Sequence, residues 1–468
     1  MMLFEDLEKY ADRPAVYTNR QYTYSEMLET ADSIGRAVGE RTLIFSLCTN
    51  NEESLFGYVG FLRGQVVPVL LDAAIPSAQL EKLIELYEPT HIWASAERED
   101  LVENMDVLFT FGDYALFERG TNVQHDLHEE LALLLTTSGS TGSPKLVRLT
   151  YQNLSSNAVS IAQYLDIQGD DKPITTLPMN YSYGLSILNS HLIQGASVIL
   201  TDRSIVQKEF WELCRTHEAT TFGGVPFHYE MLKRLKFETY DIPSLKKLTQ
   251  AGGKLSPKLA RHFATVCERK GIQFFMMYGQ TEATARMSYL PHEMNLEKAG
   301  SIGIPIPGGS LSLQDEAGNE IVDSNVTGEL IYRGDNVSFG YAHSLTDLAN
   351  GDEHHGVLRT GDMAYMDDDG YFFIAGRMKR MIKMYGSRIS LDEVESLLES
   401  YGHDCICAGE DDQLIIYTLQ DETSEIKKIV KAQLNVKGVN VMQIEQVPRN
   451  RFGKILYAEL PKRELATT

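Results

Sequence analysis

The sequence predicts an α/β protein with a large N-terminal domain, built of several subdomains with helix-covered sheets, and a small α+β C-terminal domain. The chain has 468 residues, more than one hydrophobic core usually serves, so two or more domains are expected. Strand-like and helix-like segments alternate over residues 1–130, which is typical of a largely parallel sheet covered by helices. Residues 391–446 follow the order helix, strand, strand, helix, strand, which indicates a small α+β unit.

Composition and charge argue against several classes of partner. The net charge of −22 disfavours a nucleic-acid backbone or an anionic membrane as the main partner. The five cysteines are scattered and odd in number, so neither a disulfide framework nor a zinc site is indicated. The N-terminal residues lack the pattern of a signal peptide, and no apolar run is long enough to cross a bilayer. We expect a soluble, cytoplasmic protein with no nucleic-acid partner and no stable membrane anchor.

The first elements follow from hydrophobic periodicity. A helix is expected from about Ser25, because apolar residues recur at helical spacing at Met27, Leu28, Ala31, Ile34 and Val38. The elements expected next are strand, helix, strand, helix and strand, in this order at Thr42–Cys48, Glu53–Arg63, Val66–Leu71, Ser77–Leu86 and His91–Ala94.

An apolar run at Leu131–Leu135 predicts a short buried strand, which ends in a loop of hydroxyl residues and glycines closed by Pro144 and Lys145. Glycine lets backbone N–H groups approach an anion, hydroxyls donate hydrogen bonds and lysine adds a positive charge, so this loop fits a phosphate group. Gly139 and Gly142 lack the spacing of a P-loop. A flexible surface loop is the alternative, and the serines leave a hydrolase open.

The middle of the chain continues the alternation of strands and helices. Thr150 is a candidate cap for a helix that runs to about Leu165. A strand is expected at Thr175–Met179, and Asn180–Gly184 follow it. Next come a strand at Ser197–Thr201, a helix at Gln207–His217, and a strand with a turn at Thr221–Pro226. A further strand ends in Gly252 and Gly253, which permits close approach of a flat group, although two glycines are more often a plain turn.

The stretch Phe274–Thr284 is the most informative part of the sequence. A buried strand ends at Tyr278 and is followed by Gly279, Gln280, Thr281 and Glu282. A tyrosine ring offers its face to a purine, and a polyphosphate needs a hard cation, which prefers carboxylate oxygen. These residue types are compatible with a nucleotide site at which Glu282 binds Mg²⁺, whereas Thr-Glu alone would usually be a helix start.

Polar residues in the last third of the chain suggest further contacts and turns. The Asp362 carboxylate has the lone pairs to accept two hydrogen bonds. The triplet Asp367–Asp369 lacks the spacing of an EF-hand and is interpreted as a hairpin turn between Ala364–Met366 and Tyr371–Ile374. Ser390 with Glu393 predicts a capping box at the start of the next helix.

Several of these segments resemble the motifs of the acyl-adenylate-forming superfamily, which includes acyl-CoA synthetases, the adenylation domains of nonribosomal peptide synthetases, and luciferases. The resemblance covers essentially the whole chain, and its motifs are TSGSTGSPK at 137–145, YGQTE at 278–282, RTGD at 359–362, KMYGSRI at 383–389 and PRNRFGK at 448–454. It implies ATP-dependent activation of a carboxylic acid to an acyl-adenylate, with release of pyrophosphate, and then acyl transfer to a thiol.

The resemblance also implies roles for individual residues. The catalytic residues would be Lys454, which bridges carboxylate and phosphate, Thr281 at the α-phosphate and Glu282 at Mg²⁺. The ATP- and AMP-binding residues would be Thr137, Ser138, Gly139, Ser140, Thr141, Gly142, Lys145, Gly252, Gly253, Tyr278, Gly279, Gln280, Asp362 and Arg377. The cofactors would be ATP and Mg²⁺, with CoA or phosphopantetheine as the acceptor.

The acid pocket implied by the resemblance contains Asn180, Tyr181, Tyr183, Gly184, Gly223 and Gly224. Tyr181 stands where many acyl-CoA synthetases have histidine, and the aspartate that binds the amino group of amino-acid substrates is absent here. Polar and aromatic residues suit a small, aryl or hydroxylated acid, and an acid with a medium-length acyl chain stays open as an alternative. The alternative is that Tyr181 and Tyr183 are ordinary half-buried aromatic residues.

The resemblance further implies two domains that rotate about Lys379, a large AMP-binding domain at 1–378 and a small mobile domain at 379–468. Gly386 and Arg388 would line the channel for the thiol, which belongs either to CoA or to an acyl or peptidyl carrier protein. Two other functions stay open. A Ser/Lys amidase would use Lys145 but leaves Glu282 and Lys454 without a role, and a relative that has lost catalysis would only bind nucleotide.

Overall fold

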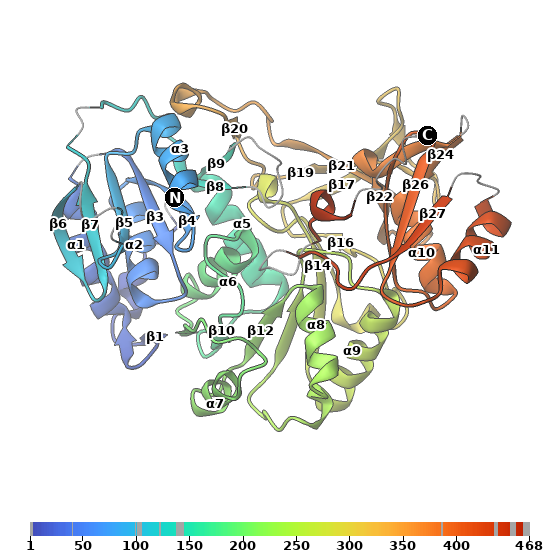
Figure 1. Cartoon of the computed structure of the whole chain (residues 1–468). Coiled ribbons are helices and arrows are strands. Elements are labelled where there is room, and N and C mark those ends of the chain that lie inside the picture. The colour runs from blue at the N-terminus through green and yellow to red at the C-terminus, as the bar shows by residue number, and fades with distance from the viewer. Residues whose placement is uncertain are drawn as a thin grey trace. The chain divides into compact units, whose positions relative to one another are not determined.

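The structure is a computed structural model that describes residues 3–39, 41–98, 100, 105–120, 123–136, 145–384, 387–434, 439–449 and 455–461. The chain divides into two compact units (Figure 1). Unit 1 consists of Met1–Ser310 and Tyr332–Leu358, and unit 2 of Leu311–Ile331 and Arg359–Thr468. This division rests on contacts and does not test the predicted domain boundary between residues 378 and 379 or the predicted hinge at Lys379, which stay predictions.

One sheet of unit 1 has eight strands in the order β20-β9-β8-β4-β3-β5-β7-β6. Their bounds are β3 Leu43–Cys48, β4 Val67–Asp72, β5 His91–Ser95, β6 Asp106–Phe111, β7 Tyr114–Glu118, β8 Leu131–Thr136, β9 Leu146–Thr150 and β20 Gly340–Ala342. The four strands β8, β4, β3 and β5 are parallel, and antiparallel strands flank them on both sides. Strands β3 and β8 are almost continuously apolar and buried, as expected for parallel strands covered on both faces.

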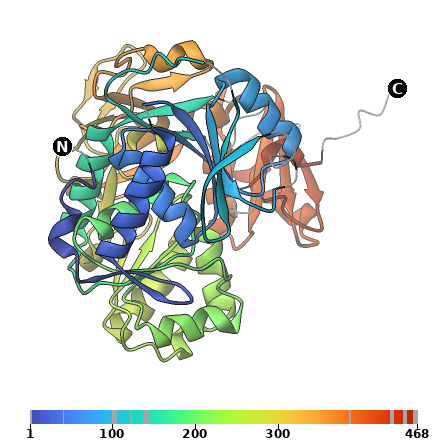
Figure 2. The ribbon, with the colours of Figure 1, turned by 90° about the vertical axis from the view of Figure 1, so that its left-hand side faces the viewer.

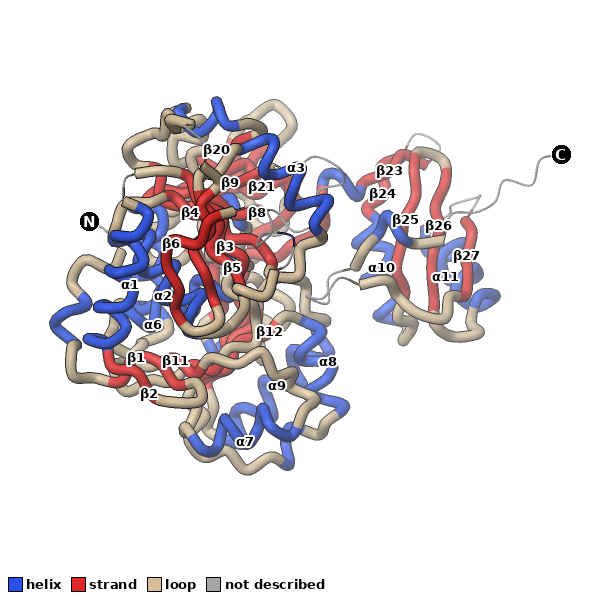
Figure 3. Tube along the Cα trace, turned by 60° about the vertical axis from the view of Figure 1, so that its left-hand side comes forward, coloured by secondary structure: helices blue, strands red, loops and turns tan. Residues whose placement is uncertain are grey.

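Helices cover both faces of this sheet (Figure 3). Ile44 of β3 packs into one apolar cluster with α2 (Glu52–Arg63), whereas its neighbours Leu43 and Phe45 pack into another with α3 (Ser77–Tyr87). Helix α1 (Tyr24–Val38) packs on α2, and a Cβ atom on Gly35 would lie 2.6 Å from the Gly60 carbonyl oxygen. Figure 2 shows these two N-terminal helices in blue. The predicted helix from Ser25 and the predicted strands of residues 42–94 are thus present.

The second sheet of unit 1 has nine strands in the order β16-β15-β14-β13-β12-β10-β11-β1-β2. Their bounds are β1 Pro14–Tyr17, β2 Gln21–Thr23, β10 Pro173–Ile174, β11 Val198–Ile199, β12 Thr221–Gly224, β13 Lys247–Gln250, β14 Gln273–Tyr278, β15 Ser288–Leu290 and β16 Ile304–Pro305. The six neighbouring strands β14, β13, β12, β10, β11 and β1 are parallel to one another. The outer strands β2, β15 and β16 pair in antiparallel fashion. The carboxyl ends of β12, β13 and β14 therefore meet at one edge, where ligands of such sheets usually bind.

The helices associated with the second sheet are α5 Tyr151–Tyr164, α6 Ser182–Leu192, α7 Lys208–Thr216, α8 Pro226–Arg234 and α9 Pro257–Lys270. Thr150 caps α5 as predicted, in a capping box with Asn153. The strand predicted at Thr175–Met179 is wrong in position: β10 comprises only Pro173 and Ile174, and α6 starts three residues after Met179. The Thr175 hydroxyl donates a 2.9 Å hydrogen bond to the Thr201 carbonyl oxygen. A side-chain hydrogen bond thus replaces the backbone hydrogen bond that a longer strand would make here.

Unit 2 contains a five-stranded sheet in the order β18-β17-β19-β21-β22, with bounds β17 Ser310–Gln314, β18 Glu320–Ile321, β19 Gly328–Arg333, β21 Val357–Met366 and β22 Phe372–Arg377. The predicted hairpin turn at Asp367–Asp369 joins β21 and β22. The C-terminal part has β23 Met381–Met384, β24 Ser387–Ser390, α10 Leu391–Ser400, β25 Cys405–Glu410, β26 Gln413–Thr418, α11 Thr423–Leu434 and β27 Val439–Gln443. Its element order is the predicted one.

The C-terminal part of unit 2 has an apolar core of its own, to which α10 contributes Val394 and Leu398 and β26 contributes Ile416. Ser390 caps α10 by accepting a hydrogen bond from the Glu393 N–H, which is one half of the predicted capping box. Among the residues that the structure describes, no helix has both the length and the apolar character needed to cross a membrane.

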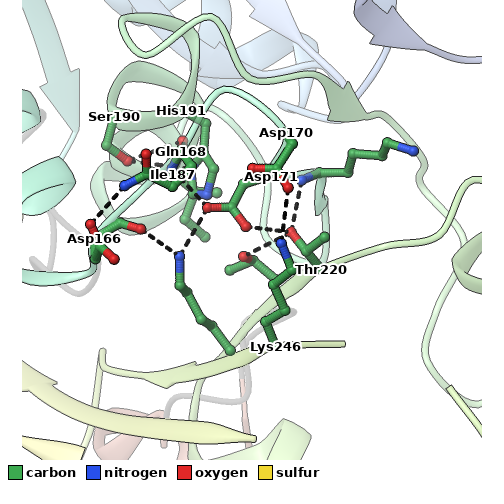
Figure 4. Close-up of polar contacts among 12 residues, drawn as sticks. Asp166, Gln168, Asp170, Asp171, Ile187, Ser190, His191, Thr220 and Lys246 are labelled. Atoms are coloured by element: carbon green, nitrogen blue, oxygen red, sulfur yellow. Dashed lines mark hydrogen bonds and ion pairs between the residues drawn. The ribbon is translucent and has the colours of Figure 1, made fainter. Parts of the chain in front are cut away.

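A buried ion pair lies at the amino ends of β10, β12 and β13 in the second sheet, and Figure 4 shows its Asp171 side chain. The Asp171 carboxylate accepts hydrogen bonds from Lys247 Nζ at 2.9 Å, from the Gln168 N–H at 2.9 Å and from the Thr220 hydroxyl at 3.0 Å. The Asp171 and Lys247 side chains are 1% and 6% exposed. Burial raises the pKa of Asp171, but the hydrogen bonds from Gln168 and Lys247 outweigh it, so the pKa is lowered overall. The Asp171 carboxylate therefore stays charged and fixes the residues before β10 to β13.

We expect Asp171→Asn to lower the free energy of unfolding by about 3 kcal/mol, because Lys247 would keep a buried charge without its partner. Asp170→Asn is the matched control, since the Asp170–Lys246 pair beside it is 75% and 50% exposed and worth less than about 1 kcal/mol. Chemical unfolding curves of the whole chain would measure both. Equal losses in the two variants would contradict a special role for the buried pair.

A buried histidine predicts how stability depends on pH. His191 of α6 donates from Nδ1 to the Ile187 carbonyl oxygen at 2.8 Å, its Nε2 has no hydrogen-bond partner among the described residues, and burial lowers its pKa to about 4. The unfolded chain, with a histidine pKa near 6.5, takes up the proton first, so stability that is complete above pH 6.5 is lost as the pH falls toward 4.

We expect His191→Gln to reduce the slope of unfolding free energy against pH between those two values, by up to about 1.4 kcal/mol per pH unit. His343→Gln changes an exposed histidine and is expected to leave the slope as it is. Urea unfolding at a series of pH values would test both, and an unchanged slope in the His191 variant would contradict this account.

Candidate active site

The turn that follows β14 places several of the predicted nucleotide residues. It runs from Gly279 to Arg286 and contains a short 3₁₀ helix at Thr281–Ala283. Only glycine fits at position 279, because a Cβ atom there would collide with the Ala285 carbonyl oxygen. Thr284 is left-handed, with φ of 61°, and Ala285 also has a positive φ of 145°. The chain is therefore folded back tightly at the carboxyl end of the strand.

Asn336 holds this turn in place. Its side-chain Nδ2 donates to the carbonyl oxygens of Ala283 at 2.8 Å and Arg286 at 2.9 Å, and its own carbonyl oxygen accepts from the Thr284 hydroxyl at 2.6 Å. The Ser338 N–H donates to the Glu282 carbonyl oxygen at 2.9 Å. Asn336 is 3% exposed, so water competes little for these bonds. The predicted catalytic residues thus stand on a rigid support.

Thr281, Glu282 and Lys145 lie in one neighbourhood. The Thr281 hydroxyl lies 3.2 Å from the Ser182 hydroxyl at the start of α6. The Glu282 carboxylate accepts a 2.6 Å hydrogen bond from the Tyr341 hydroxyl, and Lys145 Nζ lies 3.6 Å from the centre of the same tyrosine ring. Tyr341 of β20 thus stands between a carboxylate and an ammonium group. Burial, and next the Glu282 charge, raise the pKa of Tyr341, so its hydroxyl keeps the proton that it donates.

Tyr181 and Tyr183 form one wall of the predicted acid pocket. Their ring centres are 6.3 Å apart in an edge-to-face arrangement, and the Tyr183 hydroxyl lies 2.9 Å from the Thr249 hydroxyl. A Cβ atom on Gly223 would lie 3.4 Å from the Tyr183 hydroxyl, and one on Gly252 would collide with the Tyr181 hydroxyl. Burial raises the pKa of each tyrosine to about 12. The structure therefore brings these four predicted residues together as neutral, hydrogen-bonding surface.

The remaining described residues that are predicted to line the acid pocket or to bind ATP and AMP do not contact the tyrosine wall in the same way. Asn180 is buried just before α6, and Gly184 packs against the Pro178 carbonyl oxygen. Gly224 and Gly253 approach α8, where added Cβ atoms would lie 3.0 Å from His228 Cβ and 3.1 Å from Pro226 Cγ. Gln280 Nε2 donates to the Tyr278 hydroxyl at 3.2 Å.

Asp362 and Arg377 belong to unit 2, where they form a pair across β21 and β22. Arg377 Nε lies 3.0 Å from an Asp362 carboxylate oxygen, and the two side chains are 54% and 3% exposed. Lys379 is exposed on a short 3₁₀ helix, Met378–Arg380. The next residue, Arg380, is bound to Asp392 at 2.7 Å and Glu395 at 2.6 Å. The predicted roles of Asp362 and Arg377 in binding ATP and AMP, and of Lys379 as the hinge, stay predictions.

Some predicted residues lie outside the part of the chain that the structure describes. They are Thr137, Ser138, Gly139, Ser140, Thr141 and Gly142 of the phosphate loop, Gly386 of the thiol channel, and Lys454. Of Arg388 only the backbone is described, in a pair with Lys383 of β23.

Sequence reasoning missed Ser182, Tyr341 and Arg286. Ser182 and Tyr341 are distant in sequence from the residues they contact, and Tyr341 lies 59 positions after Glu282. Arg286 follows the YGQTE stretch closely and is an arginine among apolar residues before a buried strand, a signal that could have been noticed. Its guanidinium lies 4.4 Å from the centre of the Tyr183 ring, beside the predicted pocket.

The sequence of the chain is similar to those of known proteins. Residues 3–342 match the model of a family described as AMP-binding enzyme. The chain is 28% identical over 403 residues to 2-succinylbenzoate–CoA ligase of Bacillus pumilus, which covers 83% of this chain and 79% of the relative. It is 26% identical over 486 residues to the enzyme of the same name from Bacillus velezensis, covering 96% of each.

A similar solved structure is that of O-succinylbenzoate coenzyme A synthetase from Bacillus subtilis in complex with AMP. The TM-score is 0.81 at 22% identity, and 98% of each chain is covered. The likeness confirms the predicted fold class, a large domain of helix-covered sheets followed by a small α+β domain.

We expect Tyr341→Phe to raise the Mg²⁺ concentration for half-maximal ATP–pyrophosphate exchange about tenfold or more, because partners that orient a metal-binding carboxylate typically contribute that much. Tyr87→Phe is the matched control. It removes a 2.8 Å hydrogen bond to the Ala342 carbonyl oxygen, next to Tyr341, without touching Glu282. An unchanged Mg²⁺ dependence in the Tyr341 variant would contradict the orienting role.

Proposed function

This chain belongs to the AMP-binding enzyme family, and from that premise we propose that it is an AMP-forming acid–CoA ligase whose acid binds beside Tyr181 and Tyr183. Membership bears out the predicted activity, ATP-dependent activation of a carboxylic acid as an acyl-adenylate. The observation that carries the proposal is the assembly of Thr281, Glu282 and Lys145 around the turn after β14, next to the tyrosine wall.

The reaction transfers an adenylyl group to the acid. An oxygen of the ionised carboxylate forms a bond to the α-phosphorus of ATP, the bond from this phosphorus to the bridging oxygen breaks, and pyrophosphate leaves. No general base is needed, since a carboxylic acid is ionised at neutral pH. Negative charge gathers on the phosphoryl oxygens, so positioning and positive charge dominate the catalysis.

Within this proposal each predicted residue has one task. Lys145 and the loop at 137–142 hold phosphate oxygens, Thr281 donates to the α-phosphate, and Lys454 bridges the acid and the phosphate. Among the described residues no group of three or more histidine, cysteine, aspartate or glutamate side chains could hold a metal ion. A Mg²⁺ ion would therefore bind mainly to the phosphates of ATP, with Glu282 as its protein ligand.

The acid and the acceptor are inferred from relatives and from the pocket. Related proteins are named 2-succinylbenzoate–CoA ligases, and we propose an aryl acid of this kind as substrate and CoA as acceptor. The tyrosine wall supports an aromatic acid, because two edge-to-face rings offer both apolar surface and hydroxyl groups. The amidase, the inactive relative and the carrier-protein acceptor have no supporting observation. Location in the cytoplasm stays a prediction.

The test of the proposed function uses the whole chain with ATP, Mg²⁺ and a panel of acids. Acid-dependent ATP–pyrophosphate exchange, followed by thioester formation when CoA is added, is the expected result. Binding of ATP without exchange for any acid would contradict the proposal, and exchange without a thioester would contradict CoA as the acceptor.

We expect Lys454→Ala to lower the exchange rate at least a hundredfold while ATP binding, measured by calorimetry, changes little, because the charge acts mainly in the transition state. Lys427→Ala on α11 removes an exposed lysine of the same unit and is the control. Exchange at the normal rate in the Lys454 variant would remove this lysine from the mechanism.

A further inference from the structure

The guanidinium of Arg148 contacts the backbone of a segment that is distant in the sequence. Its Nε donates to the Tyr341 carbonyl oxygen at 3.1 Å, and its Nη2 donates to that of Phe339 at 2.9 Å. Its Nη1 donates to the carbonyl oxygens of Asn350 and Gly351, to the latter at 3.2 Å. Arg148 is 1% exposed, and these four acceptors follow it by 191 to 203 positions.

These contacts use the complete donor set of the side chain. A guanidinium carries five N–H groups in a fixed planar arrangement. Four of them have the carbonyl oxygens as acceptors, and Nη2 also lies 2.9 Å from a carboxylate oxygen of Glu353. Because Glu353 is 50% exposed, water screens its charge, so the attachment does not depend on this ion pair alone. A lysine has three donors on a single atom and could not reproduce the set.

The segment that Arg148 contacts contains β20, a strand at the edge of the eight-stranded sheet. This strand has three residues and pairs with β9, where Gly340 lies opposite Arg148. A short edge strand makes few ladder hydrogen bonds, so contacts from side chains contribute to its position. Phe339 and Tyr341 flank Gly340, which has a φ of 118° and whose added Cβ atom would lie 3.1 Å from Arg148 Nη2. The guanidinium therefore lies against backbone where a side chain would crowd it.

Tyr341 connects this segment with the predicted site for Mg²⁺ and phosphate. Its hydroxyl donates to the Glu282 carboxylate at 2.6 Å, and Lys145 Nζ lies 3.6 Å from the centre of its ring. Lys145 directly precedes β9, and Arg148 follows three residues later in that strand. The Arg148 side chain thus joins the strand that follows the predicted phosphate loop to the residue that contacts the predicted Mg²⁺ ligand.

We propose that Arg148 is a positioning residue of the adenylation site: it holds the backbone on both sides of Gly340, and this places the Tyr341 hydroxyl so that it orients Glu282 toward Mg²⁺. This inference rests on the proposed ligase function, in which Glu282 binds the Mg²⁺ of ATP. Partners outside the first shell of a metal site typically act in this way, since a donor with its own support keeps a metal-binding carboxylate in one orientation. A residue that only supported the fold would affect stability and leave the dependence on Mg²⁺ unchanged.

The first experiment measures how ATP–pyrophosphate exchange by the whole chain depends on Mg²⁺. Arg148→Lys keeps the charge but not the five donors, and we expect it to raise the Mg²⁺ concentration for half-maximal exchange about tenfold. Arg41→Lys is the matched control and is expected to leave this concentration unchanged. The Arg41 guanidinium also donates to backbone carbonyl oxygens, but those of Gln65, His128 and Leu131, none of which belongs to the predicted site. No rise in Arg148→Lys, or an equal rise in both variants, would overturn the inference.

The second experiment measures binding in place of turnover. Calorimetry gives the Kd of ATP with a chelator and with excess Mg²⁺, and the ratio of the first value to the second reports how strongly Mg²⁺ supports ATP binding. We expect Arg148→Lys and Tyr341→Phe to lower this ratio to a similar extent, because both loosen Glu282. A ratio in Arg148→Lys equal to that of the unchanged chain would overturn the inference.

The third experiment combines the two substitutions to test whether Arg148 acts through Tyr341. Tyr341→Phe already removes the contact with Glu282, so adding Arg148→Lys is expected to raise the half-maximal Mg²⁺ concentration by less than about twofold more. If the factors of the two single variants multiply in the double variant, the two residues act independently, which would overturn the inference.

Should Arg148→Lys not fold, as judged by thermal melting, Gly340→Ala takes its place. The added Cβ atom would crowd Arg148 Nη2 and collide with the Glu353 carboxylate, whose side chain is exposed and able to move. We expect this variant also to raise the Mg²⁺ concentration for half-maximal exchange, and an unchanged concentration would overturn the inference.

The binding measurement separates this inference from the proposed function. If Mg²⁺ supports ATP binding but no acid supports exchange, the ligase function fails, and the ratio of Kd values in Arg148→Lys still decides the inference. If acids are used normally and Arg148→Lys leaves the dependence on Mg²⁺ unchanged, only the inference fails.

Discussion

The rest of the site depends on the tight turn between Gly279 and Arg286. Its backbone is folded so closely that Gly279 has no room for a side chain, and two residues with positive φ complete it. Asn336 fixes it through buried hydrogen bonds to Ala283 and Arg286. Because Thr281 and Glu282 stand at its start and Arg286 at its end, one turn positions both the predicted phosphate chemistry and the charge at the acid pocket. A rigid support of this kind is what positional catalysis requires.

A second feature of unit 1 is the set of neighbours that surround each of its charged side chains. Two buried cations of unit 1 have a counter-charge within the protein, since Lys247 pairs with Asp171 and Arg148 with Glu353. Glu282 contacts the hydroxyl of Tyr341, and Lys145 contacts the ring of the same side chain. The two charges therefore contact different parts of Tyr341, and both remain available to a ligand. The contacts recorded for the Arg286 side chain within the described residues are with the Ser186 and Tyr164 hydroxyls, the Met277 sulfur and the Tyr183 ring.

Much of the fold could be predicted because its signals are local. The helix at Tyr24–Val38, the buried strands β3, β4 and β8, and the order of elements after residue 391 follow from apolar spacing that neighbouring residues show by themselves. The strand placed at Thr175–Met179 was wrong because a short apolar run does not say where ladder pairing stops, and here the Thr175 side chain bonds to Thr201 instead. Strand pairing depends on partners that are distant in sequence.

The sequence by itself determined the family and the α/β class, and it predicted a site with Thr281, Glu282 and Lys145, because each is contained in a short motif whose residue types suit phosphate and Mg²⁺. Only the tertiary structure decided what surrounds them. Ser182, Tyr341 and Arg286 acquire their meaning from contacts across 59 to 100 positions of the chain, which no local pattern reports. The physical reason is that pairing and burial of charge depend on three-dimensional distance, whereas motifs depend on distance along the chain.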